Sequence, residues 1–190
     1  MKLISGLVFI ILFFISCGKT NHKEPKIWSP NNLNWSDFNK MRSVPDGYSV
    51  QIYTGIECPL MITEANDAIY AYMDLNKSIF EKGLSDSSGV LLKHEQYHFN
   101  ITEYFARVIR KNVVEIGIEN LTSARLKTVF EFYIDEKNSF QVDYDESTNH
   151  GLINESQLLW EKKIDSLLFT VKEYTNINIY EYTDFAYGLD

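Results

Sequence analysis

The chain has 190 residues, of which 45% are hydrophobic and 14% are aromatic. This composition excludes an extended disordered protein, and the length is enough for a hydrophobic core. The formal net charge of −8 argues against a binding surface for nucleic acid or anionic lipid, because both ligands require clustered positive charge. We therefore expect one acidic globular domain and no nucleic-acid partner.

Residues 1–17 have the pattern of a bacterial lipoprotein signal peptide. A positively charged start precedes an apolar run from Leu3 to Ile15, which is too short to span a bilayer. The next residues complete Phe14-Ile15-Ser16-Cys17, which resembles a lipobox with phenylalanine where leucine is commonest. We expect a lipid on Cys17 that anchors an exported protein to a bacterial membrane in the cell envelope. An ordinary cleaved signal peptide is the alternative.

Residues 18–32 are polar and contain two prolines, which predicts a flexible tether before a domain at residues 33–190. If Cys17 carries a lipid, Cys58 has no disulfide partner within the chain, because the sequence holds two cysteines. We expect Cys58 to be a small buried residue and not a zinc ligand, since no second Cys or His lies near it in the sequence.

The predicted domain begins with strands. Alternating apolar residues indicate one strand from Tyr48 to Ile56 and another from Asp67 to Leu75. Residues 76–88 form a polar connection to the first helix. Because the strands precede the helices along the chain, the predicted fold class is α+β.

Three helices are predicted from the spacing of apolar residues. The first runs from about Ser88 to Lys111, the second from about Thr122 to Asn138, and the third from Asn154 to about Phe169. The tail from Val171 is a candidate for a short strand.

The first predicted helix contains His94-Glu95-Gln96-Tyr97-His98. Two histidines four residues apart project from one face of a helix and can bind the same metal ion. Both lie on the apolar stripe of this helix, where unpaired imidazoles would be costly. A zinc ion would satisfy both rings, and Glu95 could then take a proton from a zinc-activated water. The alternative is a buried helix face with two hydrogen-bonded histidines.

A catalytic zinc site needs a third protein ligand and an open position for water. We predict His150 as this ligand, because residues 144–151 are polar and rich in turn formers, and could fold back as a loop over the first helix. Glu103 lies about 140° around the helix from His98, so a straight helix points it elsewhere, and it could orient a ligand where the helix bends. Four carboxylates remain as alternative third ligands: Glu103, Glu115, Glu119 and Asp145.

Two separated motifs resemble a bacterial family of unknown function, whose members are predicted to be secreted zinc-dependent proteases of the zincin superfamily. That family typically reads His-Glu-Gln-Gly-His-Phe-Asp, followed later by Tyr-Asp-x-x-Thr-x-His-Gly and then by Gln and Trp. This chain has the first motif at residues 94–100 and the second at residues 144–151, followed by Gln157 and Trp160. An early Trp-x-Asp-Phe is also present at residues 35–38. The chain has Tyr97 where the family usually has Gly, and Asn100 where it has Asp.

The resemblance implies a zincin-like fold and a membrane-anchored zinc metallopeptidase that hydrolyses amide bonds in peptide or protein substrates. In the mechanism that we expect, Glu95 is the general base and Tyr144 stabilises the oxyanion. Glu103 and Asp145 are expected to accept hydrogen bonds from the ligand imidazoles. The expected zinc ligands are His94, His98 and His150.

Two other functions are compatible with the sequence. The first is a non-catalytic surface lipoprotein that binds zinc structurally or binds a partner, and a closed site with four protein ligands would favour it. The second is a tethered adhesion or scaffold module in which the histidines only pack in the core. Stability that does not change with a chelator would favour this second function.

Overall fold

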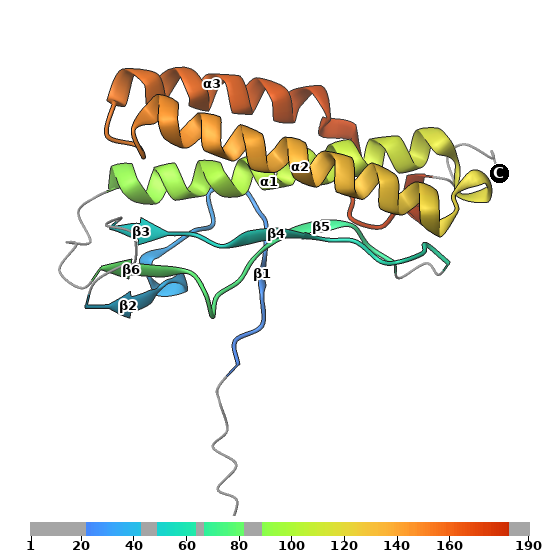
Figure 1. The fold of residues 1–190 in the computed structure, drawn as a ribbon, viewed down its shortest axis with the longest axis horizontal. Coiled ribbons are helices and arrows are strands. Elements are labelled where there is room, and N and C mark those ends of the chain that lie inside the picture. The colour runs from blue at the N-terminus through green and yellow to red at the C-terminus, as the bar shows by residue number, and fades with distance from the viewer. Residues whose placement is uncertain (1–21, 43–48, 64–66, 82–88, 183–190) are drawn as a thin grey trace, which may run out of the picture.

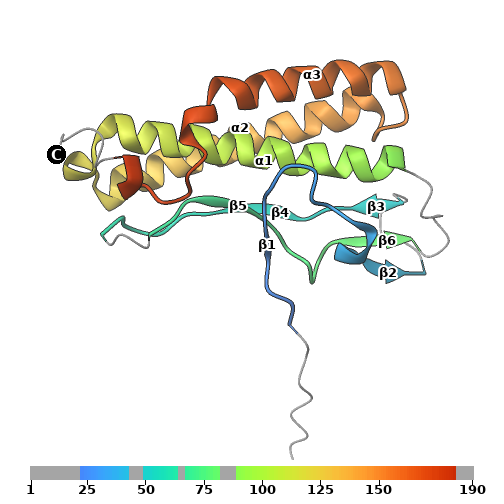
Figure 2. The same ribbon diagram turned by 180° about the vertical axis from the view of Figure 1, so that it is seen from behind.

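Three long helices lie on one side of two small sheets (Figures 1 and 2). The computed structural model describes residues 22–42, 49–63, 67–81 and 89–182. The predicted signal peptide, with Cys17, and the first residues of the predicted tether lie outside these ranges. The predicted mixture of strands followed by helices is confirmed for the described residues.

Within the described residues, six short strands form the two sheets. Their bounds are β1 Lys26–Ile27, β2 Asn39–Met41, β3 Val50–Gln51, β4 Thr54–Glu57, β5 Tyr70–Met73 and β6 Ile79–Glu81. One sheet has the order β1-β5-β4 and the other the order β2-β6-β3. The predicted strand from Asp67 to Leu75 is confirmed in shortened form as β5, and the predicted polar connection after it contains β6.

The predicted strand from Tyr48 to Ile56 divides into β3 and β4, which belong to different sheets. β3 pairs with β6, and β4 pairs with β5. In the described part of the chain each of them is an edge strand of its sheet. Residues 50–57 therefore run along the edge of one sheet and then along the edge of the other.

Part of the predicted tether is folded against the domain. β1 pairs with β5, and Lys26 forms an ion pair of 2.6 Å with Asp37. The indole N–H of Trp28 donates to Asn100 Oδ1 at 2.9 Å, and the ring lies against the guanidinium of Arg107. These polar contacts, which sequence periodicity does not show, make the segment from Lys26 onward part of the domain.

The helices are longer than their apolar spacing predicts. They are α1 Gly89–Ile116, α2 Ser123–Thr148 and α3 Asn154–Thr170, with short 3-10 helices at Trp35–Asp37, Ile118–Asn120 and Lys172–Tyr174. The hydroxyl of Thr122 caps α2 by accepting from the backbone N–H of Arg125. In the predicted C-terminal strand region, the described residues form a single bridge, between Ala68 and Asn178.

α1 is the centre of the molecule, because it lies between the sheets and the other two helices (Figure 1). Its polar residues are therefore buried along with its apolar ones, and need partners. The carboxylate of Glu103 accepts from Arg107 at 2.8 Å and from the fully buried Arg110 at 2.6 Å. Glu103 thus holds two arginines in the core, in place of the predicted role of orienting a histidine.

Cys58 is a half-buried free thiol, as predicted for a small filler residue. Burial, with a smaller contribution from Glu57, raises the pKa of Cys58 to about 12, so the thiol stays protonated at neutral pH. None of the helices in the described ranges has the length and apolar character needed to cross a membrane.

Candidate metal centre

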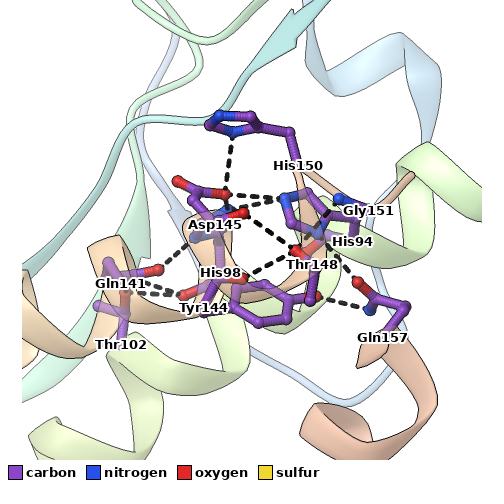
Figure 3. A network of polar contacts seen from close by, with 10 residues as sticks. All are labelled: His94, His98, Thr102, Gln141, Tyr144, Asp145, Thr148, His150, Gly151 and Gln157. Atoms are coloured by element: carbon purple, nitrogen blue, oxygen red, sulfur yellow. Dashed lines mark hydrogen bonds and ion pairs between the residues drawn. The ribbon is translucent and has the colours of Figure 1, made fainter. Parts of the chain in front are cut away.

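Two histidines of α1 meet one aspartate of α2 in the interior of the molecule (Figure 3). Asp145 Oδ1 lies 3.0 Å from His94 Nε2 and 2.8 Å from His98 Nε2. The two Nε2 atoms are 3.0 Å apart. The predicted placement of both imidazoles on one helix face is therefore confirmed.

Asp145 reaches this position because α2 continues to Thr148. The prediction of a loop over residues 144–151 is wrong for its first half, which forms the last turn of α2. The helix ends where Asn149 and His150 adopt left-handed backbone angles, with φ of 47° and 53°. Gly151 follows with φ of 79°, and a Cβ at this position would lie 3.0 Å from the His94 ring. Glycine is therefore needed for the chain to turn this closely over the site.

Two glutamines determine which nitrogen of each imidazole carries the proton. The Gln141 amide N–H donates to the backbone carbonyl of His98 at 3.0 Å, and the Gln157 amide N–H donates to the carboxylate of Glu161 at 3.1 Å. Each glutamine therefore turns its amide oxygen toward a histidine Nδ1 atom, which must donate. His94 Nδ1 donates to the Gln157 amide oxygen at 3.1 Å, and His98 Nδ1 donates to the Gln141 amide oxygen.

A neutral imidazole with a protonated Nδ1 has a lone pair on Nε2. Both Nε2 lone pairs therefore face each other and the carboxylate of Asp145. Three electron-rich atoms at these distances repel one another unless a cation lies among them, and either a proton or a metal ion would serve. Histidine, histidine and carboxylate are a donor set of zinc and related divalent ions, so the residues present fit a metal.

The charge state of Asp145 is consistent with a ligand. Burial acts against ionisation, but the contacts with His94 and His98, whose Nε2 atoms donate to Asp145 when the rings are protonated, outweigh it and hold the pKa of Asp145 below its usual range. For His98 burial acts in the opposite direction to the hydrogen bond with Asp145, and the net result is a raised pKa. The site therefore presents an anionic carboxylate and an imidazole that attracts a positive charge.

His150 lies beside this group but not at its centre (Figure 3). Its Nδ1 atom is 3.4 Å from Asp145 Oδ1, and its side chain is 40% exposed. Within the described residues, the donor atoms that converge within 4.8 Å of one another belong to His94, His98 and Asp145. The geometry thus favours Asp145, one of the alternatives from the sequence, as third ligand in place of the predicted His150.

Tyr144 supports the site from behind. Its ring stacks on His94 with the centroids 4.6 Å apart, and Gln157 donates to its hydroxyl at 2.6 Å. The side chain is fully buried, and burial is the main cause of a raised pKa. The predicted contact of Tyr144 with an oxyanion is therefore replaced by a packing role. The other two carboxylate alternatives are remote from the histidines, since Glu115 pairs with Lys111 and Glu119 contacts Asn120.

Glu95 lies between the histidines and the sheets, at the wall of a cleft of about 660 Å³. Burial raises the pKa of its carboxyl group, while His98 and His94 act in the opposite direction. The carboxylate also accepts a hydrogen bond from the backbone of Ile52, next to β3. The lining residues are Ser49, Val50, Gln51, Ile52, Tyr53, Thr54, Leu91, His94, Glu95, His98, Lys137, Gln141, Asp145, His150 and Leu152.

No protein-family model, curated protein or solved structure matches this chain. The family resemblance of its two motifs remains a prediction. What the structure provides is a set of three side chains that could hold a metal ion, a buried carboxyl group beside them, and a cleft that reaches both.

Proposed function

We propose that this protein is a zinc-dependent peptidase, in which His94, His98 and Asp145 hold the ion at the floor of the cleft. The observation that carries the proposal is the pair of Nε2 lone pairs, fixed by two glutamines and directed at one carboxylate. Three protein donors leave a position open, as hydrolysis by a metal requires. We include in the proposal a zincin-like fold, because a His-Glu-x-x-His helix lies beside an edge strand.

A bound zinc ion would supply Lewis acidity, which lowers the pKa of a water molecule and polarises a carbonyl group. Glu95 provides the proton transfer. Its pKa is raised by burial, so its carboxylate can take a proton from a water during attack and return it to the leaving amine. Gln141 and Gln157 keep both rings in the tautomer and orientation that expose Nε2 to the cleft.

A peptide is the substrate class that best fits the wall of the cleft. Residues 49–54 line it, and they include β3, an edge strand, and the start of β4. An extended peptide can bind to such an edge through main-chain hydrogen bonds, with little dependence on its sequence. This arrangement would place a backbone amide of the peptide close to Glu95 and the three donors.

We also propose that a lipid on Cys17 anchors the domain to a bacterial membrane in the cell envelope. The described N-terminal residues leave the domain on the side of the sheets, away from α2 and α3 (Figure 1). Mass spectrometry of the mature protein from a bacterial membrane fraction is expected to show a chain that starts at a lipidated Cys17. A mature chain that starts elsewhere and carries no lipid would contradict the anchor.

Removal and return of the metal test the proposed activity. The full chain is expected to contain about one zinc ion, to cleave a mixture of peptides from a protein digest, and to lose this cleavage after treatment with a chelator. Added zinc should restore it, as monitored by mass spectrometry of the products. Cleavage that survives complete metal removal contradicts the proposal. Stable zinc binding with no cleavage would favour the non-catalytic alternative.

A further inference from the structure

Lys137 is a buried lysine on the wall of the cleft. It is 7% exposed and lines the same cleft as Glu95 and the three metal donors. Lys137, Gln141 and Asp145 follow one another at intervals of four residues in α2, so they form one stripe on this helix. The Lys137 side chain therefore lies on the same face of α2 as Asp145, the proposed metal ligand, and Gln141, which bonds to His98.

In the described ranges no ion pair or hydrogen bond to the Lys137 ammonium is found, and its Nζ atom keeps some accessible surface, because it is not among the fully buried polar atoms without a partner. Lysines are almost never buried to this extent without a partner, because removing the charge from water is costly. Burial alone lowers the pKa of Lys137. Since the cleft is the open space that Lys137 lines, a molecule bound there is the candidate partner.

The charges of the cleft indicate what kind of partner it is. The carboxylates of Glu95 and Asp145 would balance a divalent ion, and the charge of Lys137 would remain. A cleft with one uncompensated positive charge, in a chain with a net charge of −8, favours a ligand that carries a negative group. For a peptide this group is a carboxylate.

The position of Lys137 limits where this carboxylate can be. Lys137 precedes Asp145 by eight residues in α2, which corresponds to about 12 Å along the helix axis. An extended peptide advances by about 3.3–3.6 Å per residue, so this separation covers about three residues. We propose that Lys137 binds a carboxylate of the substrate within about three residues of the cleaved bond. This inference rests on the proposed peptidase function.

A cleavage assay with three peptide mixtures tests the role of Lys137. All are N-acetylated hexapeptides whose random positions exclude Asp and Glu; the first ends in a free carboxylate, the second ends in an amide, and the third ends in an amide with glutamate as its last residue. The zinc-loaded full chain is expected to cleave at least one acidic mixture about tenfold faster than the neutral amide mixture. The free-carboxylate and glutamate mixtures distinguish a chain terminus from an acidic side chain.

Three variants complete the assay. Lys137→Met is expected to reduce the preference to within about twofold, whereas Lys137→Arg should retain most of it. Lys127→Met is the matched control, because Lys127 lies on the same helix, is exposed and pairs with Glu131 at 3.6 Å. This control should keep the wild-type preference. Cleavage of all three mixtures at equal rates by the wild type would overturn the inference and leave the proposed peptidase intact.

Thermal unfolding provides a readout that does not require hydrolysis. An acidic peptide mixture at millimolar concentration should raise the melting temperature of the wild type but not that of Lys137→Met. Without peptide, Lys137→Met should itself melt about 2–4 °C higher, because it removes an unpaired charge from a side chain that is largely buried. A rise with acidic peptides and no cleavage would support the carboxylate site and contradict the peptidase function. No rise with any mixture, or a lower melting temperature for Lys137→Met, would overturn the inference.

Discussion

Replacing Asp145 by asparagine is expected to weaken zinc binding by about 100-fold or more, which corresponds to about 3 kcal/mol. Asparagine has the size of aspartate but lacks the negative charge that lies 2.8 and 3.0 Å from the two Nε2 atoms. Loss of this charge leaves two imidazoles to hold the ion. Competition with a fluorescent zinc chelator would measure the change in affinity.

Two matched variants make the Asp145→Asn result specific. Asp143→Asn changes an exposed aspartate of the same helix turn and should leave zinc affinity unchanged. His150→Ala should reduce affinity by less than about tenfold, because its Nδ1 atom contacts Asp145 and not the two Nε2 atoms. If His150→Ala releases the zinc while Asp145→Asn keeps it, His150 is the third ligand, as the sequence pattern alone suggested.

The histidine pair could be predicted because its geometry is local. Residues 94 and 98 lie on one face of any regular helix, and the apolar spacing around them predicts that this face is buried. The same periodicity located all three long helices. Local spacing therefore identified two of the three side chains that could hold a metal ion.

The third donor depends on how α2 ends, and the sequence is ambiguous there. Residues 144–151 are polar and rich in turn-forming residues, which favoured a loop that carries His150 back over the first helix. In the structure, Tyr144 and Thr148 are both fully buried, so packing keeps the segment helical and presents Asp145 to α1. Tertiary contacts thus decided between two local structures of similar propensity.

The roles of the two glutamines have no sequence signature of their own. An amide can donate or accept, so its function is defined only by the partners that surround it. Gln141 precedes Asp145 by four residues, so the two share a helix face once α2 is seen to continue to Thr148. The same spacing brings Lys137 to that face. The division of residues 50–57 between two sheets could not be read from alternation, which looks the same in one strand or two.

Replacing Glu95 by glutamine is expected to lower the rate of peptide cleavage by about 100- to 10,000-fold while zinc affinity stays within a few-fold of the wild type. Glutamine keeps an oxygen that can accept from the backbone of Ile52, so the side chain should remain in place. It cannot take up a proton from water. Comparing kcat/KM for the peptide mixture with zinc affinity separates the loss of the base from the loss of the metal.

The melting temperature of Glu95→Gln and the activity of a second glutamate variant test whether the loss of cleavage has an indirect cause. Glu95→Gln removes a buried acid whose pKa is raised chiefly by desolvation, so its melting temperature should equal or exceed that of the wild type. Glu115→Gln changes an exposed glutamate of the same helix and should keep full activity. Full activity of Glu95→Gln would show that another group transfers the proton, and the described residues that line the cleft leave His150 as the next base to test. A rate that falls in Glu95→Gln alone, with zinc still bound, assigns proton transfer to the carboxyl group between the donors and the sheet edge.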